Sequence, residues 1–379
     1  MKNTEFKDLV LFITGPTYIR PEIRQAGTYC EFGHRDKVAK VKVESILKNL
    51  RKLAGVNEDY EVCLVCGSGS FAMEASIRSL VKDNENILNV SVGAFGDLYH
   101  KMTASNKKNV DLLKFKPGKA IDLNKLEEQL KSKKYDVVTF THNETSTGVT
   151  NDMVKVCKLI QKYGAMPLVD GVSIFGGVKI PFDEAKPSVY ITSTQKCLGL
   201  PAGFGIMFVH KDALEKAKSV ESRGYVTDLV SIVASGQKSQ TVTTPNCTLI
   251  NQMMEQLEYI VEEEGIDNRF KRHEDMQKMV ADWVENSLSD DFKFFSQEGY
   301  RSPVVSAIEI PKYVDRMAIK ESLREKGYLF DPGYGKLNKS LEENGENLNI
   351  RVGHMGDITP EMLSKYLEEL ESEFKKYKP

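Results

Sequence analysis

The sequence is poor in several features that mark particular classes of protein. Its 379 residues include one tryptophan and six histidines, and none of its apolar runs is long enough to span a membrane. Lys and Arg number 52 against 54 Asp and Glu, so the formal charge of -2 offers no basic field for a nucleic acid backbone. The histidines are scattered, without the spacing of a metal site. We therefore expect no nucleic acid partner, no membrane partner and no protein-bound metal.

The cysteines are also few, with six in the whole chain. They lack the regular spacing of a disulfide framework, which favours reduced thiols. Cys63 and Cys66 form a CxxC pair, but no second pair completes a zinc site. The first residues contain no signal-peptide pattern, so the sequence predicts a cytoplasmic protein.

The composition is that of a globular protein, with 41% hydrophobic and 28% charged residues. A chain of this length predicts two or three domains. Short apolar runs recur between amphipathic stretches, as in strands that are buried on both faces of a sheet with helices crossing between them. The expected strands cover residues 61–66, 87–93, 136–142, 166–170, 188–194 and 204–209, and the expected crossover helices cover 71–81, 122–133 and 153–164. The pattern predicts an α/β domain with a mostly parallel sheet.

The pattern changes after a polar stretch at 235–247. A long helical region follows to about residue 290, and the remaining segments alternate as in a smaller α+β domain. In the last helix, Thr359 suits the N-cap and Pro360 the first turn, ahead of an apolar stripe from Leu363 to Phe374. We expect an N-terminal arm (1–20), a large α/β domain (21–250) and a small α+β domain (251–379).

The segment Gly67-Ser68-Gly69-Ser70 lies between a predicted strand and a predicted helix. Free N–H groups and the helix dipole at such a turn favour an anion, so phosphate binding is the first hypothesis. The glycines also fit a loose dinucleotide pattern, but the next strand ends in Ser91-Val92-Gly93, where an NAD site needs an acidic residue. A tight turn without a ligand is the other interpretation.

Two further residues lie where predicted strands end. Asp170 suits either a helix cap or the protonated ring nitrogen of a pyridine cofactor. Lys196 follows in ITSTQKCLGLPAGFG, beside hydroxyl and amide side chains that suit an anionic cofactor. A lysine that is partly desolvated there can lose its proton and form an imine.

Read in order, the segments CGSGSFAMEA, VGAFG, THNETSTGV, VDGVSIFGG, TSTQKCLGLPAG and IRVGHMGD resemble the class V aminotransferases. The resemblance extends from ITGPT at 13–17 to Arg351 and is strongest to the alanine:glyoxylate and serine:pyruvate group. It implies the type I fold of pyridoxal-phosphate enzymes, with pyridoxal 5'-phosphate held by Lys196 as a Schiff base and Asp170 on its ring nitrogen. The resemblance also implies a homodimer with active sites near the interface.

The resemblance assigns further residues to the cofactor. Phe95 would stack on its ring, Val172 would lie against the ring face and Thr145 near the ring oxygen. The phosphate would be held by Ser68, Gly69, Ser70 and Gln195.

Substrate and partner-subunit contacts are also implied. Arg351 corresponds to the clamp for the substrate α-carboxylate, and Gly15 and Thr17 belong to a segment that lines the substrate side. A phosphate contact from the partner subunit would come from Thr243, while Gln240 stands where some relatives have Tyr.

The expected reaction transfers an amino group from alanine, serine or aspartate to glyoxylate or pyruvate, with Lys196 relaying the proton. The alternative within the family is 2-aminoethylphosphonate:pyruvate transamination, for which Arg35 and Arg223 are the candidate phosphonate-binding residues. Outside this chemistry, an NAD-dependent dehydrogenase and a binding protein without catalysis remain as alternatives. The sequence does not identify the donor, the acceptor or the pathway.

Overall fold

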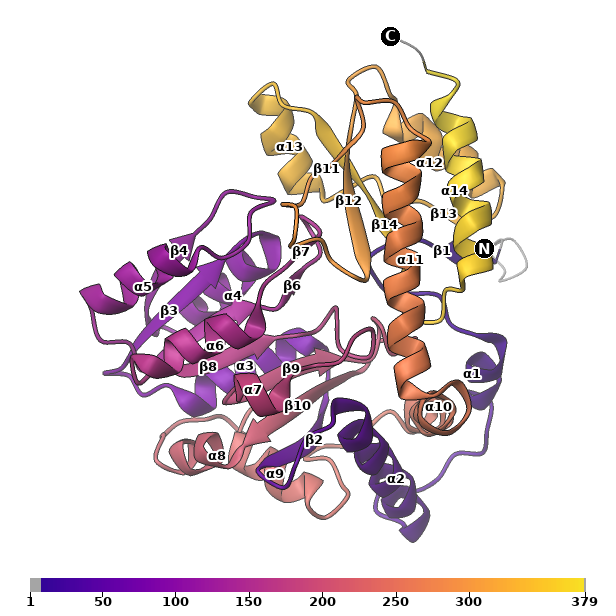
Figure 1. The fold of residues 1–379 in the computed structure, drawn as a ribbon. Helices are drawn as coiled ribbons and strands as arrows, with labels where there is room; N and C mark the ends of the chain where they lie inside the picture. The colour runs from indigo at the N-terminus through magenta and orange to yellow at the C-terminus, as the bar shows by residue number, and fades with distance from the viewer. Residues whose placement is uncertain (1–7, 378–379) are drawn as a thin grey trace.

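The computed structural model describes residues 8–377, so the first seven residues of the predicted N-terminal arm lie outside the described part. A seven-stranded sheet forms the centre of the molecule (Figure 1). Its spatial order is β2-β10-β9-β8-β5-β3-β4, and β10 runs antiparallel to both of its neighbours. The strands are β2 (Tyr60–Cys66), β3 (Asn86–Ser91), β4 (Asn109–Lys114), β5 (Val137–Thr141), β8 (Met166–Asp170), β9 (Val189–Ser193) and β10 (Phe204–His210). The predicted α/β architecture with a mostly parallel sheet is confirmed.

Both faces of this sheet are covered, because successive side chains of a strand point to opposite faces. In β10, Phe204, Ile206 and Phe208 enter one hydrophobic cluster, while Met207 and Val209 enter the other. The helices on the first face are α2 (Lys37–Ala54), α5 (Leu123–Ser132), α6 (Met153–Lys162), α7 (Phe182–Ala185) and α10 (Cys247–Glu258). The helices on the second face are α3 (Gly69–Leu80), α4 (Ala94–Ser105), α8 (Lys211–Lys218) and α9 (Leu229–Gly236).

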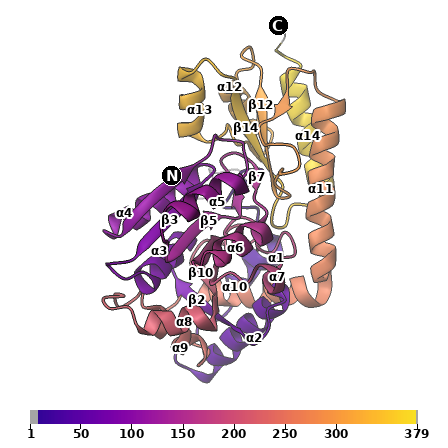
Figure 2. The ribbon, with the colours of Figure 1, turned by 60° about the vertical axis from the view of Figure 1, so that its left-hand side comes forward.

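A second, smaller sheet is formed by residues toward the C-terminal end of the chain (Figure 2). It has three antiparallel strands in the order β11-β12-β14. Its strands are β11 (Lys293–Phe294), β12 (Val305–Ile310) and β14 (Leu348–Gly353). The helices of this part are α11 (Ile266–Asn286), α12 (Arg316–Glu325), α13 (Gly335–Glu343) and α14 (Pro360–Phe374). Thr359 caps α14 through a bond from Met362 N, and the predicted stripe of α14 is buried.

The short elements join the two parts. Strand β1 (Val10–Leu11) pairs with β13 (Tyr328–Leu329) in a separate two-stranded sheet. A hydrogen bond from Gly353 N to the carbonyl oxygen of Phe12, at 2.9 Å, holds this segment next to β14. The others are α1 (Pro21–Ala26), the hairpin of β6 (Asn143–Glu144) with β7 (Val149–Thr150), and the π-helical turn η2 (Tyr259–Glu264). The domain boundary expected at residue 250 stays a prediction, and that residue lies within α10. Within residues 8–377, no helix combines the length and apolar character needed to cross a membrane.

Candidate active site

The sheet topology brings the predicted site residues to one edge. Strands β2, β3, β5, β8 and β9 are mutually parallel, so their carboxyl ends meet at the same edge of the sheet. Asp170 is the last residue of β8, and Ser193 is the last residue of its neighbour β9. The glycine turn after β2 leads into α3 at this edge, and Phe95 lies at the start of α4.

Lys196 lies in the turn after β9 and packs against the N-terminal segment. Its Nζ atom donates a hydrogen bond to the carbonyl oxygen of Thr14. A Cβ atom on Gly15 would come within 2.7 Å of the lysine side chain, and Gly15 has φ of +111°, so the close approach requires glycine. Thr17 Oγ1 donates to the carbonyl oxygen of Lys196 at 3.0 Å. The predicted substrate-side segment therefore lies directly against the lysine.

The environment of Lys196 favours the neutral amine. Burial, and then the positive charge of Arg351, lower the pKa of Lys196 to about 8. An amine with this pKa is partly unprotonated near neutral pH, which is the form that reacts with an aldehyde.

Asp170 is buried, with 4% of its surface exposed. Its Oδ1 atom accepts a hydrogen bond from Val172 N at 3.0 Å. Burial raises the pKa of Asp170 to about 7. A carboxyl group in this state would become a stable carboxylate if a protonated ring nitrogen were placed against it.

The space next to α3 fits a phosphorylated cofactor such as the pyridoxal phosphate expected from the sequence. A Cβ atom on Gly69 would lie 2.5 Å from Val172 Cγ2 and 3.3 Å from Ser193 Oγ, so only glycine lets the start of α3 pack this closely against Val172 and Ser193. The first turn of α3 leaves backbone N–H groups without helical partners. Within the described chain, the hydroxyl oxygens Ser193 Oγ and Thr145 Oγ1, which can donate to an anion, are buried without a hydrogen-bond partner. Unpaired buried donors and acceptors of this kind are costly unless a ligand satisfies them.

Phe95 is held by a buried carboxylate that the sequence analysis did not identify. Glu144 Oε2 accepts from the N–H groups of Phe95 at 2.9 Å and Gly96 at 3.3 Å, and Glu144 Oε1 accepts from Ser146 N at 3.0 Å. Burial raises the pKa of Glu144. The carboxyl group thus fixes the start of α4 and the position of the Phe95 ring.

A cavity of about 390 Å³ opens beside Phe95 and is also lined by Ser146 and Tyr334. The Tyr334 ring centre is 6.4 Å from that of Phe95 and 6.0 Å from the Arg351 guanidinium carbon. Tyr334 is therefore next to both the predicted stacking residue and the predicted carboxylate clamp, while Lys196, Asp170 and Arg351 are absent from the lining of this cavity in the described chain.

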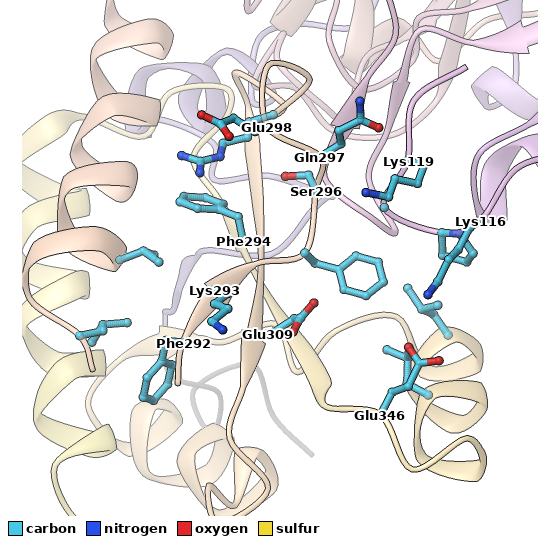
Figure 3. A pocket seen from close by; sticks show the side chains of 18 of the residues that line it. Lys116, Lys119, Phe292, Lys293, Phe294, Ser296, Gln297, Glu298, Glu309 and Glu346 are labelled. Atoms are coloured by element: carbon cyan, nitrogen blue, oxygen red, sulfur yellow. The ribbon is translucent and has the colours of Figure 1, made fainter. Parts of the chain in front are cut away.

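A larger cavity of about 1160 Å³ adjoins it, because Pro117, Leu337 and Ser340 line both. Figure 3 shows Lys116 and Lys119 on one side of the larger cavity, and Lys293 and Glu309 of the small sheet on the other. The predicted site residues Lys196, Asp170 and Arg351 are absent from its lining in the described chain. Its lining carries both signs of charge, so it shows no preference for an anionic ligand.

Arg351 lies on β14 and is 8% exposed. Its Nη1 atom donates to the carbonyl oxygen of Thr145 at 3.1 Å, which joins the small sheet to the NETSTG segment. Its other contacts are to Asp331, a second residue that the sequence analysis missed.

The remaining predicted residues are Ser68, Ser70, Thr243 and Gln240. Ser68 and Ser70 are exposed at the start of α3. Thr243 lines a smaller cavity of about 180 Å³ with Cys66 and Phe71, close to the glycine turn. Gln240 accepts a hydrogen bond from Arg35 at 2.8 Å.

Comparisons with known proteins identify the family of the chain. The profile described as "Aminotransferase class-V" matches residues 24–334. The chain is 29% identical over 352 residues to an uncharacterised aminotransferase of Methanocaldococcus jannaschii, covering 92% of this chain and 88% of that protein. It is 28% identical over 325 residues to a 2-aminoethylphosphonate–pyruvate transaminase of Bacillus cereus, covering 83% and 84%.

Solved structures of low sequence identity share the fold. Alanine–glyoxylate aminotransferase of Nostoc sp. superposes with a TM-score of 0.89 at 24% identity, covering 99% of this chain and 97% of that one. Ureidoglycine–glyoxylate aminotransferase of Bacillus subtilis gives 0.88 at 22%, covering 97% and 93%. The fold is therefore the type I fold expected from the sequence. Since the family profile covers well over half of its length, the chain belongs to the class V aminotransferases, and its cofactor is pyridoxal 5'-phosphate.

Proposed function

We propose that this aminotransferase moves an amino group from a small amino acid (alanine, serine or aspartate) to a 2-oxo acid (glyoxylate or pyruvate). The observation that carries the proposal is the placement of Lys196. Its amine has a pKa lowered to about 8, first by burial and then by the charge of Arg351, and the Asp170 carboxylate also acts on it.

Lys196 binds the cofactor and acts as the proton carrier. When bound, pyridoxal phosphate supplies an electron sink for the bonds at the substrate's α-carbon. With its amine free of the cofactor, Lys196 Nζ would hold the proton removed from the substrate's α-carbon and return it in the 1,3-proton shift. The contact of Lys196 with Thr14 and Gly15 keeps its side chain on the substrate side.

The remaining cofactor contacts follow from the positions described above. Asp170 would pair with the ring nitrogen, with Phe95 and Val172 flanking the ring and Thr145 near its oxygen. The phosphate would be held by Ser68, Gly69, Ser70 and Gln195, together with the unpaired hydroxyl of Ser193. Thr243 stays a proposed phosphate contact.

Arg351 is proposed to bind the α-carboxylate of both substrates. Its planar guanidinium group presents paired N–H donors that match a carboxylate. Gly15 and Thr17 close the same side of the site.

2-Aminoethylphosphonate is the second candidate donor, because a relative with that printed activity is 28% identical. The two arginines considered for its phosphonate are engaged elsewhere. Arg223 pairs with Asp228 at 2.5 Å, and Arg35 donates to Gln240. Because both arginines have partners of their own in the described part of the chain, carboxylate donors are the first choice.

A homodimer and a cytoplasmic location are also proposed. Tyr29, Val38 and Val41 are exposed apolar side chains near or on α2, and Tyr225 is 78% exposed, as expected for surfaces that a second subunit covers. The six free cysteines suit a reducing compartment. Sedimentation of the purified protein tests the dimer.

The substrate proposal is tested by turnover of the cofactor-loaded enzyme. Alanine, serine, aspartate and 2-aminoethylphosphonate are each combined with glyoxylate and with pyruvate, and the two products are measured. We expect a carboxylate donor to have the highest kcat/KM. A higher value for 2-aminoethylphosphonate would select the alternative, and failure of all donors would reject both.

A further inference from the structure

Arg351 is paired with Asp331 by side chain and backbone together. Asp331 is 4% exposed and lies just after β13. Arg351 Nε donates to Asp331 Oδ1 at 3.1 Å, and Arg351 Nη2 lies 3.1 Å from Asp331 Oδ2. The backbone N–H of Arg351 also donates to the carbonyl oxygen of Asp331 at 3.1 Å. The two side chains are therefore held in one relative orientation.

The Asp331 carboxylate has further donors that fix it in place. Its Oδ1 accepts from Gly333 N at 3.0 Å, and its Oδ2 accepts from Thr14 N at 3.3 Å. Thr14 is also the residue whose carbonyl oxygen accepts from Lys196. Asp331 thus connects the carboxylate clamp to the segment that contacts the catalytic lysine.

The pair leaves Arg351 able to bind an anion. A guanidinium group has five N–H donors, of which the one on Nε donates to Asp331 and one on Nη1 donates to the Thr145 carbonyl oxygen, while Nη2 is in ion-pair contact with Asp331. Two N–H groups then remain without a partner in the described chain. Two such donors suffice for one carboxylate, so Arg351 can bind a substrate without leaving Asp331.

The charges limit which anion suits this position. Arg351 and Asp331 together carry no net charge, so a ligand with one negative charge gains the paired N–H contacts, whereas a second negative charge meets the nearby Asp331 carboxylate. The cavity beside Phe95 is also lined by Lys101, Lys336 and the Lys114–Asp97 pair, which are exposed, so solvent screens their effect on an anion. Another charge near Arg351 is the amine of Lys196, which in the loaded enzyme would be taken up by the cofactor.

Resting on the function proposed above, we propose that Asp331 is a specificity-determining residue that restricts the anion bound at Arg351 to a singly charged carboxylate. It disfavours doubly charged phosphonate or phosphate groups at that position. One unit of charge at this range and in partly buried surroundings changes relative binding by about tenfold or more.

The first test uses binding alone, without turnover. Acetate and methylphosphonate are titrated calorimetrically into the cofactor-loaded wild-type enzyme, at a pH where the phosphonate is singly charged and at one where it is doubly charged. We expect the affinity for methylphosphonate, relative to that for acetate, to fall about tenfold or more when the second charge appears. An unchanged or increased relative affinity would overturn the proposal.

The second test uses Asp331→Asn, which keeps the size of the side chain and removes its charge. In D331N, methylphosphonate should no longer bind more weakly when it carries its second charge. The ratio of kcat/KM for 2-aminoethylphosphonate to kcat/KM for alanine should also rise about tenfold or more. Asp83→Asn is the control for the change in net charge, because Asp83 is 97% exposed and pairs with Lys108. A D331N enzyme whose anion preference matches that of D83N would contradict the proposal.

The two tests separate this inference from the proposed function. If no donor in the activity matrix turns over, the titrations of wild-type protein still decide the role of Asp331. If D331N does not fold, the wild-type comparison at two charge states decides it as well.

Discussion

Arg269 Nη2 lies 2.5 Å from the carbonyl oxygen of Cys197, the residue that follows Lys196. Arg269 is on α11, is fully buried, and also contacts Asp357 at 3.0 Å and Glu264 at 2.6 Å. Helix α11, which runs beside the small sheet (Figure 1), is thus joined to the turn that carries the lysine.

Arg269→Met should destabilise the protein strongly. It leaves the buried carboxylate of Asp357 without this partner, and breaking a buried ion pair costs about 3–5 kcal/mol. Denaturant unfolding of the wild type and the variant measures the difference. Lys271→Ala on the same helix is the control, since its pair with Asp275 is exposed and should be worth less than about 1 kcal/mol. If both variants lost a similar free energy of unfolding, the stabilising role of the buried Arg269 ion pairs would be contradicted.

Asp170 should make the stability of the apoprotein fall as pH rises. The pKa of Asp170 is about 7 in the folded protein, against an ordinary value of 3.8. Its contribution to stability is therefore fully present below pH 3.8 and is lost as the pH rises through about 7. The Asp170→Asn variant has no carboxyl group at this position, so its stability does not fall with pH in this way. We expect the apo variant to gain about 2–3 kcal/mol relative to the wild type between about pH 5 and pH 8. Unfolding curves that show a constant difference over this range would disprove it.

The lowered pKa of Lys196 should govern capture of the cofactor. The rate at which apoprotein binds pyridoxal phosphate should rise with pH around a midpoint near 8, because only the neutral amine reacts. Arg351→Gln removes a positive charge that lowers the pKa of Lys196, so the midpoint should move to higher pH. Arg301→Gln serves as the control, because Arg301 pairs with Glu285 instead. Stopped-flow absorbance across pH measures the midpoint, and equal midpoints in all three proteins would exclude this role for Arg351.

Gly69→Ala should weaken cofactor binding by about tenfold or more, since the new methyl group would lie 2.5 Å from Val172 Cγ2. Gly33→Ala is the control, because its methyl group would meet only Asp36 Cβ at 3.8 Å. Titration of each apoprotein with pyridoxal phosphate gives the dissociation constants. If both variants bind as the wild type does, the space beside Gly69 is not the phosphate site.

The sequence predicted the buried part of the fold well. The six expected strands match β2, β3, β5, β8, β9 and β10, because their side chains are apolar on both faces. Strand β4 at the edge was not predicted, since its Asn, Asp and Lys residues are partly exposed and resemble a loop. The last helix was predicted from a local cap and a regular stripe, which depend on no distant contact.

The site was predictable only where local pattern determines it. Asp170 and Ser193 end adjacent strands, so the sequence could place Asp170 near the turn that carries Lys196. Asp331 and Glu144 have no such local sign. Asp331 contacts Thr14 across 317 positions of the chain, and Glu144 contacts Phe95 across 49. These contacts arise from the packing of the small sheet and the hairpin against the large one, which local sequence does not reveal.

Lys196 is proposed to hold the cofactor as a Schiff base. This is tested most directly by borohydride reduction of the protein loaded with pyridoxal phosphate, followed by peptide mass spectrometry. We expect a phosphopyridoxyl label on Lys196 alone, and no label in folded Lys196→Ala protein. A label on a different lysine, or one that persists in the Lys196→Ala variant, would contradict it.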